Sequence, residues 1–133
     1  MNDSGGNPTV ALVGRIMFTL IFFLSGVTHF TQMSEYVALM PPAIPFRPFW
    51  VVISALVELA GAVLIVTNVG PRLGAWLIVL FLVPVTITVH GYLLATAPDH
   101  QMMQIQASFF LKGVTMTGAA LLITQLGVKP EAR

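Results

Sequence analysis

The sequence predicts an all-α integral membrane protein built as a bundle of four transmembrane helices. Only 8% of the 133 residues are charged, whereas 56% are hydrophobic. A soluble domain typically carries about a quarter charged residues, so this chain has too few to cover a water-facing surface. Its apolar residues fall into long segments, and roughly 20 helical residues are enough to cross a hydrocarbon core of about 30 Å.

The four predicted spans are residues 10–30, 49–69, 73–95 and 105–126. Each is a continuous apolar run, and lipid requires backbone groups that are satisfied within the segment, so helix is favoured over strand. The proline-rich stretch PPAIPFRP (41–48) follows the first span, and residues 34–40 before it are expected to form a short interfacial helix. We interpret residues 1–133 as a single membrane domain.

Turn residues separate the later spans. Asn68, Gly70 and Pro71 form a short connection, so the second and third spans should be antiparallel neighbours. The stretch TAPDHQ (96–101) precedes the fourth span. Pro84, inside the third span, lacks a backbone N–H donor and is expected to bend that helix, with Thr86 and Thr88 satisfying the freed backbone groups.

The basic residues predict the orientation of the chain. Arg15, Arg72, Lys129 and Arg133 lie on the side that holds both termini and the second loop, whereas only Arg47 lies in the other loops. The positive-inside rule therefore places both termini in the cytoplasm and makes this a multi-pass protein of the cytoplasmic membrane. Arg15 and Arg72 are expected at the inner interface, where long side chains reach the lipid head groups.

Each predicted span carries one ionisable residue in its outer half: His29, Glu58, His90 and Lys112. A lone carboxylate at this depth costs several kcal/mol, so Glu58 should face the bundle interior and have a partner. We expect either a Glu58–Lys112 ion pair or a protonated Glu58 hydrogen-bonded to His90, and the sequence does not choose between them. Small and hydroxyl residues lie one helical turn from each of the four, which predicts that these faces pack together.

The chain resembles the DoxX family of small four-helix membrane proteins. The resemblance rests on Arg15, on GVTHF (26–30) and VELAG (57–61), on PRLGA (71–75) and His90, and on FFLKGVTMTGAALL (109–122), in that order. Members include a membrane subunit of an archaeal thiosulfate:quinone oxidoreductase, subunits of redox-stress complexes and distant receptor-assembly chaperones. The resemblance implies that Glu58, His90 and Lys112 are family-typical positions.

Composition limits the chemistry that the chain can perform. A formal net charge of +1 without a basic run gives no indication of nucleic-acid binding, and the absence of cysteine removes disulfides, thiolates and iron–sulfur ligands. No His, Asp or Glu spacing matches a metal-ligand motif. A haem held between His29 and His90 is disfavoured, because both rings would need one face and equal depth. We therefore expect no intrinsic cofactor.

Two functional hypotheses remain. In the first, the chain is the membrane subunit of a quinone-linked redox complex, and Glu58, His90, Lys112 and His29 build a pocket for a quinone head group. A protein partner would supply the electrons, and the chain itself is a candidate for homo-oligomers. In the second, it is a non-catalytic accessory or assembly subunit, and the same residues only hold the helices together. Whether the chain turns over a substrate is left open.

Overall fold

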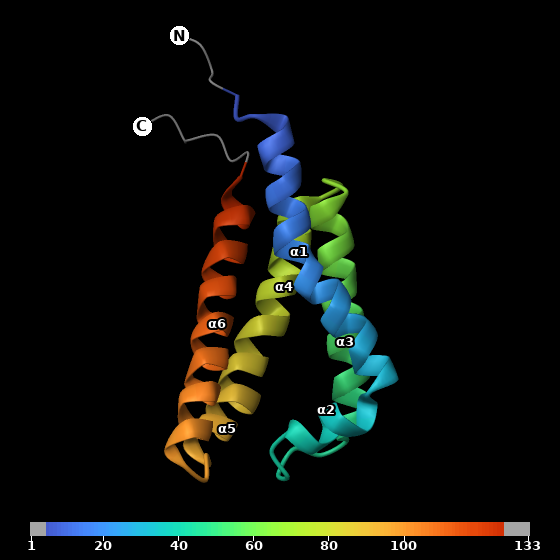
Figure 1. Cartoon of the computed structure of the whole chain (residues 1–133). Coiled ribbons are helices and arrows are strands. Elements are labelled where there is room, and N and C mark those ends of the chain that lie inside the picture. Colours follow the sequence, from blue (N-terminus) through green and yellow to red (C-terminus); the bar gives the residue numbers. More distant parts are fainter. Residues whose placement is uncertain (1–4, 127–133) are drawn as a thin grey trace, which may run out of the picture.

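A computed structural model describes residues 5–126, and within this range every regular element is helical (Figure 1). The predicted charges at Lys129 and Arg133 lie outside the described residues. The elements in chain order are α1 (Pro8–Thr31), α2 (Met33–Leu39), α3 (Arg47–Val66), α4 (Pro71–Val85), the π-helix η1 (Thr86–His90), α5 (Gly91–Ala95) and α6 (His100–Gln125). Helices α4, η1 and α5 follow one another without a break.

The predicted spans and fold class are confirmed. Four helical stretches are long and apolar enough to cross a membrane: Pro8–Thr31, Arg47–Val66, Pro71–Ala95 and His100–Gln125. The chain is therefore a multi-pass membrane protein. The fourth span begins at His100 rather than at residue 105, because the Asp99 side chain accepts a hydrogen bond from the Met102 backbone N–H at 2.8 Å and caps the helix there. The predicted interfacial helix is present as α2.

The irregularity predicted at Pro84 takes the form of a π-helix. It begins at Thr86, two residues after the proline, and ends at His90. The Thr88 hydroxyl donates to the Pro84 carbonyl oxygen at 2.7 Å, whereas the Thr86 hydroxyl has no hydrogen-bond partner among residues 5–126. Such π-helical turns change the direction in which the following side chains point, and they recur at functional sites.

The spanning helices form an open row rather than a closed ring. Helix α1 packs against α3, α3 against α4, and α4 against α6, whereas α6 has no extensive contact with α1 or α3. Figure 1 shows the consequence: α1 and α3 lie on one side, and α4, α5 and α6 lie on the other. The α1–α3 side and the α4–α5–α6 side are close to each other near the α3–α4 turn and spread apart toward α2 and α5.

Close contacts at the α3–α4 end explain this shape. A Cβ atom added to Gly61 would lie 2.9 Å from the Gly74 carbonyl oxygen, and one added to Gly74 would lie 2.7 Å from the Gly61 carbonyl oxygen. Only glycine permits this backbone approach, which is the main packing device between helices in lipid. The buried core lies here as well; it comprises Phe22, Ala62, Ile65, Ala75, Ile78, Phe81, Leu82 and Ala120.

Candidate functional site

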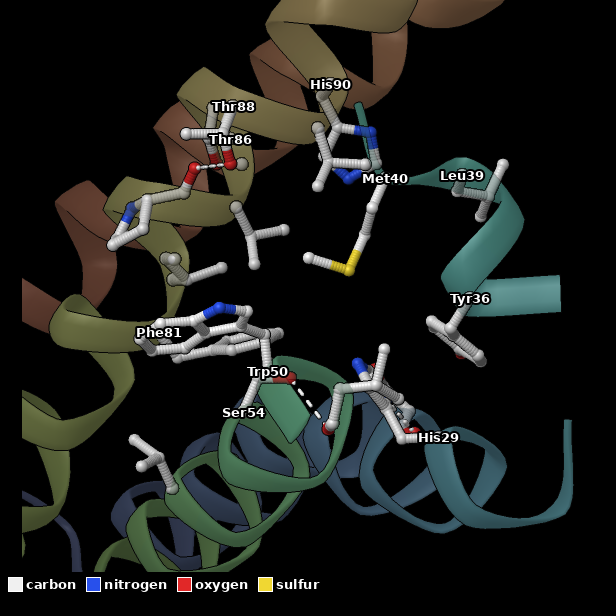
Figure 2. A pocket seen from close by; sticks show the side chains of 18 of the residues that line it. His29, Tyr36, Leu39, Met40, Trp50, Ser54, Phe81, Thr86, Thr88 and His90 are labelled. Atoms are coloured by element: carbon white, nitrogen blue, oxygen red, sulfur yellow. Dashed lines mark hydrogen bonds between the residues drawn. The ribbon is translucent and has the colours of Figure 1, made fainter. Parts of the chain in front are cut away.

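The two sides of the bundle, α1 with α3 and α4–α5 with α6, enclose a cleft at the end where they diverge. Its volume is about 560 Å³, and α1, α2, α3, α4, η1 and α6 all contribute to its lining. Figure 2 shows His29 and Tyr36 on one side of the cleft and Thr88 and His90 on the other. Of the four sequence-predicted site residues, His29, His90 and Lys112 line the cleft, and Glu58 does not.

His29 forms the α1 wall. Its side chain is 6% exposed, and its ring stacks on Tyr36 with the centroids 3.9 Å apart and an interplanar angle of 25°. The Nδ1 atom lies 2.7 Å from the Ser25 carbonyl oxygen. A carbonyl oxygen only accepts, so Nδ1 carries the proton in this contact. In the neutral ring the other nitrogen, Nε2, then has a free lone pair.

Tyr36 joins the interfacial helix α2 to α1. Its hydroxyl lies 2.7 Å from Thr28 Oγ1, and Thr28 Oγ1 donates to the Ser25 carbonyl oxygen at 2.9 Å. Because Thr28 donates its one hydroxyl proton to that carbonyl, Tyr36 is the donor in the contact between the two side chains. The contact holds the Tyr36 ring against His29 and gives the cleft an aromatic side.

Lys112 and His90 form the opposite wall, and Phe109 connects them. The Lys112 Nζ atom lies 4.6 Å from the centroid of the Phe109 ring, and the His90 ring stacks on Phe109 at 5.8 Å and 19°. An ammonium over an aromatic face is a favourable contact, although it leaves the three N–H donors available. Within residues 5–126, Lys112 has no hydrogen-bond or ion-pair partner.

Glu58 lies behind the cleft, in the interface between α1 and α3. It has no exposed surface, and neither carboxyl oxygen has a hydrogen-bond partner within the described residues. The Ser25 side chain faces it from α1 but falls outside hydrogen-bonding geometry. The predicted ion pair with Lys112 and the alternative bond to His90 are therefore both wrong. Similar depth brought these residues together in the sequence argument, but α3 and α6 belong to different halves of the open row.

The two predicted interface arginines do not line the cleft. The Arg72 Nε atom donates to the Thr124 carbonyl oxygen at 3.0 Å and ties α4 to α6 beside the α3–α4 turn. The Arg15 Nε atom is buried and has no hydrogen-bond partner in the part of the chain that the structure describes. Both residues therefore belong to the packed end of the molecule rather than to the candidate site.

Sequence reasoning missed five aromatic residues of the lining: Phe22, Tyr36, Trp50, Phe81 and Phe109. The three-residue spacing of Phe109 and Lys112 on one helix was a readable signal. The position of Tyr36 was not, because it depends on α2 folding back against α1. Phe81 approaches His29 edge-on at 6.2 Å, an inter-helix contact that no local pattern reveals.

Comparison with protein families agrees with this architecture. The DoxX family model matches residues 10–91, which is more than half of the chain. The chain belongs to the DoxX family. The match covers α1 to η1, with His29, Glu58 and His90, whereas Lys112 and Phe109 of this DoxX protein lie beyond it. No curated protein and no solved structure matches the chain.

The cleft of this DoxX protein has the composition of a small-molecule site. Such sites are mostly apolar and carry a few convergent polar groups in volumes of about 300–1,000 Å³. Here aromatic rings come from both walls, and the polar groups are an ammonium, two imidazoles and several hydroxyls. No group of three or more His, Asp or Glu residues within the described chain is arranged to hold a metal ion. The arrangement suits a flat, apolar ligand that carries oxygen atoms at its edge.

Proposed function

We propose that this chain is the membrane-embedded subunit of a quinone-linked redox complex and that the cleft binds the quinone head group. The observation that carries the proposal is that Lys112 and His29 reach one aromatic-lined cleft from opposite walls. A quinone ring carries an oxygen at each of two opposite edges and two apolar faces. Its oxygens would lie toward Lys112 and His29, and its faces against Phe81 and Phe109.

Each wall has a distinct part in this binding. The Lys112 ammonium donates to one ring oxygen and stabilises the negative charge that develops there when the ring is reduced. The aromatic side chains of Tyr36, Trp50, Phe81 and Phe109 supply stacking surface. Converting a quinone to a quinol takes two electrons and two protons. The cysteine-free sequence offers no thiol or iron–sulfur ligand, so we assign the supply of electrons to a protein partner.

The alternative is an accessory subunit whose ionisable residues only hold the helices together. That role requires the residues to bond to one another, whereas Glu58 has no hydrogen-bond partner among the described residues and Lys112 contacts Phe109. The close helix contacts are instead made at glycines: Gly61 with Gly74, and Gly113 with Thr86. This arrangement favours a binding role for Lys112 and His29 over a structural one.

Quenching of tryptophan fluorescence by a quinone analogue tests the proposal. Trp50 lines the cleft and Trp76 does not, so a Trp76→Phe protein reports from the cleft alone. We expect decylubiquinone to quench Trp50 saturably in detergent micelles. Lys112→Met should weaken binding about tenfold, the effect of losing one charge-assisted hydrogen bond. Lys112→Arg should retain most of the affinity.

His100 provides a matched control, because it is a histidine of the same chain that does not line the cleft. His100→Gln should leave binding unchanged, whereas His29→Gln should weaken it. If quenching is linear with quinone concentration and the same in every variant, the quinone merely partitions into the micelle and the proposed function is wrong.

A further inference from the structure

Three of the hydroxyl groups that line the cleft direct their protons away from it. Ser54 donates to the Val51 carbonyl oxygen at 2.9 Å, and Thr88 donates to the Pro84 carbonyl oxygen at 2.7 Å. The Tyr36 hydroxyl donates to Thr28, as derived above. A hydroxyl has one proton and two lone pairs, so each of these three groups offers the cleft only lone pairs.

The nitrogen donors of the same walls follow this pattern. Trp50 Nε1 donates to the Pro45 carbonyl oxygen at 3.1 Å, and His29 Nδ1 is bound to the Ser25 carbonyl oxygen. His29 has no carboxylate partner within the described residues, and Glu58 lies behind the cleft wall. The neutral His29 ring therefore presents an accepting Nε2. On the opposite wall, the donors of Lys112 and of the His90 ring have no hydrogen-bond partner within the described chain.

Four other unpartnered polar atoms do not alter this balance. Thr86 Oγ1, His90 Nδ1 and the Glu58 carboxyl oxygens have no hydrogen-bond partner within residues 5–126, but all of these atoms are buried beneath the surface of the cleft. Thr86 is held there by Gly113, whose missing Cβ leaves the space that the threonine side chain fills. A ligand in the cleft meets the lone pairs of His29, Ser54 and Tyr36 on one wall, and Thr88, the His90 ring and the Lys112 ammonium on the other.

From this balance we propose that the cleft selects the reduced, quinol form of its ligand over the oxidised quinone. The inference rests on the proposed function and adds the redox state to it. An oxidised quinone has two carbonyl oxygens that only accept, so one of them meets the donors of the Lys112 wall and the other faces the lone pair of His29 Nε2. A quinol has two O–H donors: one oxygen accepts from Lys112, and the opposite hydroxyl donates to His29 Nε2.

The preference follows from unmatched hydrogen bonds. When the oxidised ring binds, His29 Nε2 loses water and gains no donor, and an unsatisfied polar group in a low-dielectric site is costly. One hydrogen bond of this kind corresponds to about a tenfold difference in dissociation constant. Through linkage, a tenfold preference raises the midpoint potential of the bound two-electron couple by about 30 mV relative to the free couple.

Calorimetric titration of the same protein with decylubiquinol and with decylubiquinone, under anaerobic conditions, tests the inference. The two probes share their ring substituents and tail and differ only in redox state. We expect the quinol to bind about tenfold more tightly. His29→Phe preserves the ring that stacks on Tyr36 but removes the acceptor, so it should bring the two dissociation constants close to equality. His100→Phe is the matched control and should leave their ratio unchanged.

A second variant keeps the test informative if the His29→Phe protein does not fold. Thr88→Val removes a hydrogen-bond acceptor oxygen from the cleft and keeps the shape of the side chain, so it should also reduce the preference for the quinol. Equal binding of the two forms, or tighter binding of the quinone, overturns this inference and leaves the proposed function intact. If neither form binds the unaltered protein, the proposed function itself is wrong.

Discussion

Glu58 is the residue whose surroundings differ most from those expected for an acidic side chain in a membrane-spanning helix. An acidic side chain in a membrane-spanning helix normally faces a partner or a water-filled cavity, because polar groups without partners are expensive there. In this protein the side chain is fully buried, and both of its oxygens lack partners within the described residues. The carboxyl group therefore adds nothing to folding that an apolar side chain of similar length would not add.

Substitution of Glu58 tests this interpretation. Glu58→Met fills a similar volume without a polar group, so we expect unchanged or increased stability. Glu58→Ala leaves a cavity and should cost about 2–4 kcal/mol. Unfolding in mixed micelles, followed by tryptophan fluorescence, provides the comparison. If Met destabilises the protein as much as Ala does, the carboxyl group has a partner that this interpretation lacks.

At the scale of the elements, the packing of α3 against α4 depends on two glycines. The backbones approach so closely at Gly61 and Gly74 that a Cβ atom on either would contact the carbonyl oxygen of the other. This contact joins the two halves of the open row at one end. The divergence of the helices at the other end, and therefore the width of the cleft, depends on it.

Gly74→Ala should therefore destabilise the protein by about 1–3 kcal/mol, because the added methyl group forces the helices apart. Gly14→Ala is the matched control: it lies within α1, and a Cβ atom there meets nothing within 4 Å. We expect it to be neutral, or stabilising by up to about 1 kcal/mol through helix propensity. Equal effects of the two substitutions in the same unfolding measurement would contradict the close approach of α3 and α4.

The sequence predicted the elements well and their arrangement poorly. Hydrophobic length identified every span, and Pro84 marked the position of the π-helix. Depth along a helix is also readable from sequence, and His29, His90 and Lys112, which the sequence grouped by depth, all line the cleft. The angular position of a residue around the bundle depends on which helices pack together. For that reason Glu58 was wrongly paired with Lys112.

For the whole molecule, one prediction concerns its orientation in the membrane. The first residues of α1 and the last residues of α6 lie at the same end as the α3–α4 turn (Figure 1). The basic residues predict that this end is cytoplasmic, which places the cleft in the outer half of the bilayer. A green fluorescent protein fused to the C-terminus should then fluoresce, and alkaline phosphatase fused there should be inactive. Active phosphatase would show that the orientation is the opposite one and that the cleft lies in the inner half of the bilayer.

The position of the ligand tests the central claim most directly. A photoreactive azidoquinone, illuminated with the purified protein and mapped by mass spectrometry, reports which residues it contacts. We expect the label on cleft residues such as Tyr36, Trp50 and Phe109, and we expect excess decylubiquinol to suppress it. Label confined to lipid-facing residues such as Leu111 and Leu122, or label that the quinol does not suppress, would contradict a quinone site in the cleft.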